Sequence, residues 1–259
     1  MTADAARALR LGCVGYLNAR PLIAGWSGAV QFDHPAALCA QLAAGELDVA
    51  LVSSFEYLRD PGYAVIDGIA IASDGPVYSV IVASADPFEQ LKTIELDPAS
   101  VTSVNLLRCL VANRPVSFSL RGGAADSPIP SGMGRLLIGD QAIRFRQAHE
   151  RTHYIADLGE AWRSKASLPF VYALWLVRAG IDAIDVADRL RRRRDDNLRR
   201  LNELAANERD FGPEFVRNYW TQNLKFGFAD REKAGLSKFR SLCQEQGILP
   251  RSTAHLKVV

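Results

Sequence analysis

The 259-residue sequence has few cysteines and no cysteine motif. Its four cysteines, Cys13, Cys39, Cys109 and Cys243, lie far apart, form no C-x-x-C pair and do not cluster with histidine. Isolated cysteines in apolar surroundings are typical of small buried side chains rather than of metal sites or disulfides. We therefore expect no metal centre and no disulfide.

Long hydrophobic runs are also absent. No segment reaches the ~18 consecutive apolar residues that a membrane-spanning helix needs. Residues 1–10 carry charged side chains and contain no apolar stretch of signal-peptide length. The sequence therefore predicts a cytoplasmic protein without a membrane partner.

The chain lacks an excess of charge of either sign, because 31 basic residues against 29 acidic ones give a net charge of +2. No global field favours nucleic acid. The basic run Arg189–Arg194 invites a nucleic-acid interpretation, but it is bordered by Asp188, Asp195 and Asp196 and shares its helical pattern with an apolar face. We expect a solvated, ion-paired helix face and no nucleic-acid partner.

The chain does have 48% hydrophobic residues and a regular succession of short apolar runs and amphipathic segments. The first apolar run, Leu9 to Val14, ends at Gly15 and turns at once into a predicted helix, with Asn18 in the N-cap position and Pro21 in the opening turn. Such a junction projects polar side chains and free amides from the carboxyl end of a strand. Open α/β sheets bind their ligands at this edge.

Three later junctions are similar. The strand predicted for Asp48–Val52 ends in two serines, the helix predicted for Val101–Ala112 begins with several hydroxyls, and the strand from Leu136 to Ile138 ends at a glycine and an acidic residue. The residues at these junctions are Ser53, Ser54, Ser100, Thr102, Ser103, Gly139 and Asp140. They are candidates for binding an anion, although ordinary helix capping also explains side chains at such positions.

The order of elements predicts two α/β lobes. The pattern restarts at Asp86, and the apolar run Leu168–Val177 looks like a return to the first lobe. We expect one lobe from residues 1–84 and 176–259, with helices after Gly180, and an inserted lobe from residues 85–175. The Gly- and Pro-rich stretch Arg121–Gly134 is either a lid or only a connection.

Several motifs, taken in order, resemble one family, the chorismate dehydratases of the futalosine route to menaquinone. They are Tyr16–Asn18, Asp48–Ser54 with Glu56-Tyr57, Ser73–Val80, Leu96–Ser103, Leu137–Asp140, Asp157–Trp162 and Leu168–Trp175. The arginine-rich C-terminal third resembles the family only loosely. The resemblance implies a two-lobed type II periplasmic-binding-protein-like fold with two mixed sheets, helices on both faces and a cleft between the lobes. It also implies a hydro-lyase that converts chorismate to 3-[(1-carboxyvinyl)oxy]benzoate and water, without a metal or organic cofactor.

This reaction removes the ring C3 proton and the C4 hydroxyl of a dianion, so it needs fixed hydrogen-bond donors. None of the four histidines and no pair of carboxylates falls at the strand ends, so the sequence shows no general base. The substrate's own enolpyruvyl carboxylate is our hypothesis for the base. Asn18 would orient the substrate and Ser79 would donate to a carboxylate or to the leaving oxygen. Asp140 is the reserve base, or a helix cap.

Other readings stay open. Asn18 is a ligand residue or an N-cap, Tyr16 is cleft wall or packing, and Arg20 contacts a carboxylate or solvent. A non-catalytic solute-binding protein for a small organic anion would use the same clamp. A sister enzyme acting on a futalosine-derived substrate would share the fold, although that family looks different at the N-terminal motif.

Overall fold

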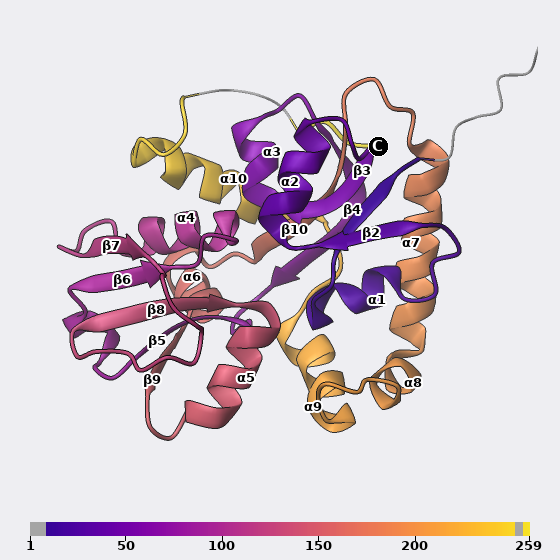
Figure 1. The fold of residues 1–259 in the computed structure, drawn as a ribbon. Coiled ribbons are helices and arrows are strands. Elements are labelled where there is room, and N and C mark those ends of the chain that lie inside the picture. Colours follow the sequence, from indigo (N-terminus) through magenta and orange to yellow (C-terminus); the bar gives the residue numbers. More distant parts are fainter. Residues whose placement is uncertain (1–8, 252–255) are drawn as a thin grey trace, which may run out of the picture.

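A computed structural model describes residues 9–251 and 256–259, which form two lobes, each built on a five-stranded sheet (Figure 1). The first sheet has the order β2-β1-β3-β10-β4, with β1 Leu11–Val14, β2 Val30–Asp33, β3 Val49–Ser53, β4 Ala64–Ser73 and β10 Phe170–Val177. The second has the order β7-β6-β8-β5-β9, with β5 Val80–Ser84, β6 Thr93–Leu96, β7 Ser117–Leu120, β8 Met133–Ile138 and β9 Tyr154–Asp157.

Helices surround both sheets. They are α1 Arg20–Ile23, α2 Pro35–Ala43, α3 Ser54–Arg59, α4 Val101–Leu110, α5 Gly139–His149, α6 Leu158–Ala166, α7 Ile184–Arg199, α8 Leu201–Ala206, α9 Pro213–Asn218 and α10 Asp230–Glu245. Short η1 Leu17–Ala19 and η2 Phe88–Gln90 are 3₁₀ turns, and η3 Tyr219–Asn223 is a π-helical turn. In the described part of the chain, no helix is long and apolar enough to cross a bilayer.

Both sheets are mixed. In the first, β1 pairs in parallel with β2 and β3, and β10 runs antiparallel between β3 and β4. In the second, β6 pairs in parallel with β7 and β8, and β5 runs antiparallel to β8 and β9. Strands β3 and β10 are almost wholly buried because helices pack against them, which explains their continuous apolar sequences.

The chain crosses between the sheets twice. Residues 74–79 lead from β4 to β5, and α6 lies on the return from β9 to β10. The boundaries expected from the sequence would leave β5 with the first lobe and most of β10 with the second, whereas the pairing gives β5 to the second sheet and β10 to the first. We propose that the lobe boundaries lie within residues 74–79 and 158–169.

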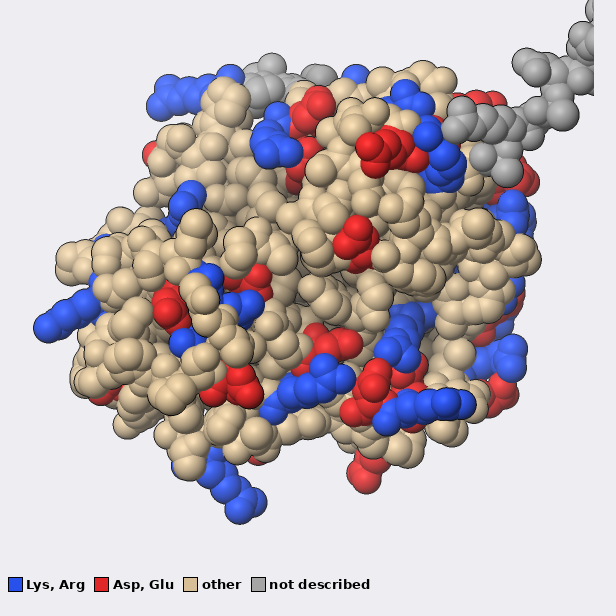
Figure 2. Space-filling model, viewed as in Figure 1, with Lys and Arg blue, Asp and Glu red and all other residues tan. Residues whose placement is uncertain are grey.

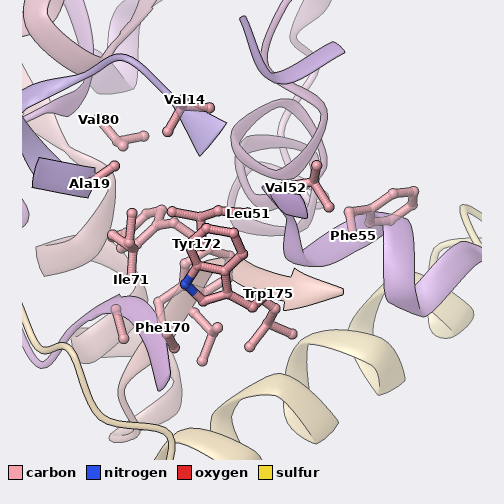
Figure 3. Close-up of a cluster of buried hydrophobic side chains, with 14 of the residues drawn as sticks. Val14, Ala19, Leu51, Val52, Phe55, Ile71, Val80, Phe170, Tyr172 and Trp175 are labelled. Carbon is pink, nitrogen blue, oxygen red and sulfur yellow. The ribbon is translucent and has the colours of Figure 1, made fainter. Parts of the chain in front are cut away.

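One hydrophobic core extends across both lobes. Figure 3 shows its central part, where Trp175 and Phe170 of β10 pack near Ile71 of β4 and Leu51 of β3. The four cysteines are buried, as expected, although the Sγ atoms of Cys109 and Cys243 lie 3.6 Å apart rather than isolated. The lobes are therefore packed against each other around a shared apolar floor.

The basic run on α7 forms ion pairs, as predicted, but it is not wholly solvated, because the Arg194 guanidinium is largely buried and donates to the carbonyl oxygens of Gly68 and Phe226. Arg191 pairs with Asp188 at 2.7 Å, and Arg199 pairs with Asp196. Figure 2 shows acidic and basic side chains interspersed over the viewed face of the molecule. Such interspersed charge does not form a single basic track.

The Gly- and Pro-rich stretch is a packed connection. The Arg135 guanidinium donates to the carbonyl oxygens of Ala125 and Ser127, and Ile129 is buried in a cluster with Ile81 and Leu137 of the second sheet. These contacts fix the stretch to its own lobe. Its residues do not line the cavity described next.

Candidate active site

A cavity lies between the lobes; it has about 70 Å³ of space for water-sized molecules, and about 600 Å³ when the open solvent at its mouth is included. Its apolar floor includes Val14, Leu51 and Ile71, which are labelled in Figure 3. Eight of the eleven residues proposed from the sequence line it, namely Tyr16, Asn18, Ser53, Ser79, Ser100, Thr102, Ser103 and Gly139. The ends of strands from both sheets therefore meet at one place.

Asn18 lies on the first-lobe side of the cavity. It sits inside η1, while α1 begins at Arg20 with Ala19 as its N-cap, so the prediction that Asn18 caps a helix is wrong. Its Oδ1 atom is buried and has no hydrogen-bond partner among the described residues. A buried amide oxygen without a partner is costly unless a ligand or water meets it. This side chain is therefore available for a bound molecule.

Ser79 lines the same cavity as Asn18. It lies at the end of the segment that leads from β4 to β5. Its side chain is buried, and its carbonyl oxygen accepts a hydrogen bond of 2.8 Å from the amide of Gly139. The bond ties the crossing to the start of α5. Ser79 is consequently held at a fixed depth in the wall.

Thr102 joins α4 to the first lobe. Its hydroxyl donates to the carbonyl oxygen of Tyr172 at 3.1 Å and accepts from the Phe55 amide at 3.3 Å. It also bonds to the hydroxyl of Ser53. Since the single proton of Thr102 goes to Tyr172, Ser53 must be the donor in that pair.

Ser54 does not line the cavity. Its hydroxyl donates to the carbonyl oxygen of Val171 at 2.7 Å. The hydroxyl protons of Ser53, Ser54 and Thr102 are therefore all donated to acceptors within the protein. These residues build the wall between α3, α4 and β10, and they offer no free proton to a substrate in this arrangement.

The first turn of α4 does offer donors. The hydroxyls of Ser100 and Ser103 make no hydrogen bond within the described residues, and Ser100 occupies the N-cap position without a side-chain cap. Ser100 thus occupies a cap position, as the alternative explanation had it, but its hydroxyl does not cap the helix. The first-turn amides have no intrahelical acceptor, and the helix dipole adds positive potential there. This end of α4 is suited to a carboxylate.

Tyr16 and Gly139 meet across the two lobes. Gly139 has φ +60°, and a Cβ atom built on it would lie 3.0 Å from Cδ2 of Tyr16. Burial, with smaller contributions from Asp97 and Asp140, raises the pKa of the Tyr16 phenol. A neutral aromatic ring therefore packs on a bare stretch of backbone at the cavity wall.

We expect Gly139→Ala to lower the free energy of unfolding by about 1–2 kcal/mol, because alanine is strained in this left-handed conformation. We also expect a several-fold higher KM, because the new methyl displaces the Tyr16 ring. Urea unfolding and steady-state kinetics measure the two effects. Gly68→Ala is the matched control, since Gly68 has φ +79° and open space around its Cβ position. An unchanged KM in Gly139→Ala would show that the ring contact does not shape the cavity.

Arg20 and Asp140 lie outside the cavity. Arg20 forms ion pairs with Glu208 and with Asp210 (3.2 Å) and borders a separate hollow. The side chain of Asp140 does not cap α5, so that prediction is wrong, and it instead accepts a hydrogen bond of 2.9 Å from the Leu17 amide. Burial is the largest cause that raises the pKa of the Asp140 carboxyl. Asp140 thus links the second lobe to η1, and the side chains of Arg20 and Asp140 do not line the proposed site.

Two aromatic residues at the site were missed from the sequence. Tyr172 lines the cavity, and its hydroxyl hydrogen-bonds Ser73 at 3.0 Å. Tyr219 reaches the side chain of Ser79 from η3. Both occur in apolar, aromatic segments that are read as core, so no local signal distinguished them.

The family described as menaquinone biosynthesis matches residues 9–245. The chain belongs to this family. Curated relatives of this menaquinone-biosynthesis protein include the chorismate dehydratase of Thermus thermophilus, 30% identical over 88% of this chain and 93% of the relative. The chorismate dehydratase of Campylobacter jejuni is 25% identical over 88% and 91% of the two chains.

Solved structures similar to this menaquinone-biosynthesis protein have the expected fold. Protein AF1704 from Archaeoglobus fulgidus superposes with a TM-score of 0.71 at 14% identity, over 93% of this chain and 98% of that one. The alkanesulfonate-binding protein SsuA from Xanthomonas axonopodis pv. citri, bound to MOPS, gives 0.63 at 13% identity over 97% of both chains. The predicted two-lobed periplasmic-binding-protein-like fold is confirmed.

Proposed function

We propose that this protein is a chorismate dehydratase, a hydro-lyase that forms 3-[(1-carboxyvinyl)oxy]benzoate and water. Membership in the menaquinone-biosynthesis family and the similarity to curated chorismate dehydratases support this activity. The observation that carries the site is the buried, unpartnered Oδ1 of Asn18 in a cavity shared with Ser79. Because Oδ1 accepts a hydrogen bond, it suits a substrate hydroxyl such as the one at C4 of chorismate, while the donors at the first turn of α4 suit the carboxylates of a small organic dianion.

In the proposed complex, one substrate carboxylate lies at the first turn of α4, near Ser100 and Ser103. The helix end and the two hydroxyls supply donors there without further movement. Asn18 orients the ring, and Ser79 donates to the C4 oxygen as it leaves. One aimed donor of this kind contributes about 10²- to 10³-fold in rate.

The cavity lining contains no histidine, aspartate or glutamate among the described residues. We propose that the enolpyruvyl carboxylate of the substrate removes the C3 proton. The C3–H and C4–O bonds break, the ring becomes aromatic, and the proton leaves with the hydroxide as water. An analogue with this carboxylate esterified should be bound and not dehydrated, and dehydration of the ester at the full rate would rule out the substrate as base.

The route needs no metal or organic cofactor, because the substrate supplies both the proton acceptor and the driving force of aromatisation. We also propose a cytoplasmic location. The four free, buried cysteines are consistent with a reducing compartment.

Incubating the purified protein with chorismate tests the proposed function. We expect enzyme-dependent absorbance of an aromatic product, with one water lost per molecule by mass spectrometry. A solute-binding protein would instead bind chorismate and return it unchanged. If the protein bound chorismate without converting it, the dehydratase proposal would be wrong and the solute-binding function would take its place.

A further inference from the structure

A π-helical turn interrupts the C-terminal helical region. Among the helices expected after Gly180, α9 ends at Asn218 and η3 continues it as a π turn from Tyr219 to Asn223. Isolated π turns are rare and occur often at functional sites. In Figure 1 this part of the chain follows α9 and lies where the two lobes approach each other.

Side chains of η3 bond to both segments that carry the proposed catalytic residues. The Tyr219 hydroxyl donates to Oγ of Ser79 at 2.6 Å. The indole Nε1 of Trp220 donates to the carbonyl oxygen of Leu17, beside Asn18, at 2.9 Å. Tyr219 and Trp220 are almost fully buried, so water does not compete for these bonds.

The backbone beside Ser79 is strained. Tyr78 is a non-glycine residue with φ +68°. The carboxylate of Asp157 accepts from the amides of Val77 at 3.0 Å and Tyr78 at 2.8 Å, and the Arg146 guanidinium lies 4.2 Å from the centre of the Tyr78 ring. A strained backbone conformation of this kind persists only where surrounding contacts hold it in place. Residues with such conformations cluster at active sites.

The hydroxyl of Ser79 has a defined direction. A serine hydroxyl has one proton and two acceptor lone pairs, and the proton of Tyr219 occupies one of these lone pairs. Ser79 lines the cavity, and no described residue accepts its hydroxyl proton. Burial raises the pKa of the Tyr219 phenol well above its usual range, so Tyr219 stays protonated and remains the donor.

We propose, on the basis of the function above, that η3 is a positioning segment in which Tyr219 holds the Ser79 hydroxyl so that its proton points at the leaving oxygen of the substrate. Tyr219 does not touch the substrate. It acts through Ser79, and it makes Ser79 a better donor because hydrogen bonds in a chain polarise one another.

Tyr219→Phe tests this role, because it removes one hydroxyl and keeps the ring. We expect kcat for chorismate to fall about 5- to 10-fold, the effect of one neutral hydrogen bond, with KM changed less than about twofold. Tyr57→Phe is the matched control. Tyr57 is also fully buried, and its hydroxyl accepts from the Lys257 amide, away from the cavity. Its loss should affect the melting temperature and leave kcat unchanged.

A double-mutant cycle separates positioning from general packing. We expect Tyr219→Phe to have no further effect on kcat when Ser79 is already alanine, because its partner is gone. An unchanged kcat in the single variant, or an equal fall in kcat in the Ser79→Ala background, would overturn the proposal. If the wild-type protein does not dehydrate chorismate, the proposed function fails instead, so the two failures are distinguishable.

Discussion

Replacing Asn18 by alanine is expected to lower kcat for chorismate dehydration by about 10²- to 10³-fold, the range found when one aimed donor, here the side-chain Nδ2 of Asn18, is removed from a preorganised site. The side chain lies in the cavity, and its Oδ1 has no protein partner among the described residues. Its removal therefore breaks no bond of that oxygen within the protein. The loss should appear in turnover rather than in folding.

Steady-state kinetics with thermal unfolding measures both effects for Asn18→Ala. We expect a melting temperature equal to or above that of the wild type, because the variant no longer buries an unpaired amide oxygen. Asn202→Ala, at an exposed position on α8, is the control and should keep full activity. An Asn18→Ala enzyme with kcat near that of the wild type would remove Asn18 from the catalytic site.

Thr102→Val is expected to lower the free energy of unfolding by about 2–4 kcal/mol, because it leaves two buried backbone groups without partners. These are the amide of Phe55 and the carbonyl of Tyr172, which both bond to the Thr102 hydroxyl. Valine has nearly the same shape, so the loss reports hydrogen bonding rather than packing. We also expect kcat/KM to fall, since the wall between α3, α4 and β10 depends on this hydroxyl.

Urea denaturation of Thr102→Val and Thr102→Ser separates the hydroxyl from the methyl group. Serine keeps the donor and acceptor, and we expect it to recover most of the stability and activity lost with valine. Equal stability of the Thr102→Val and wild-type proteins would contradict the role of the Thr102 hydroxyl in linking the two lobes.

The strand-end chemistry of the site was predictable from the sequence. Gly15, the serine pair at the junction of β3 and α3 and the residue pair at the start of α5 mark places where a strand turns directly into a helix. Parallel strands bring their carboxyl ends to one edge, so these junctions locate the cavity. Asn18, Ser53 and Gly139 accordingly lie around it, whereas Ser79 precedes β5 and Ser103 lies within α4.

Pairing over long distances could not be predicted in this way. The pattern of β5 and β10 identifies them as strands, but their sheet depends on partners far along the chain. The same holds for the contact of Tyr219 with Ser79, which are 140 residues apart. The helical pattern of the C-terminal region gave no sign of the π turn that directs Tyr219 and Trp220 to different segments.

The Asp140 contact ties the position of Asn18 to the way the two lobes pack against each other. Asp140 belongs to the second lobe, and it fixes the turn of the first lobe that carries Asn18 through the Leu17 amide. A hinge motion large enough to free the product must break this hydrogen bond. With Asn18 in its proposed role, opening of the lobes would release the product and also free the turn that carries Asn18, so chemistry would be confined to the closed state.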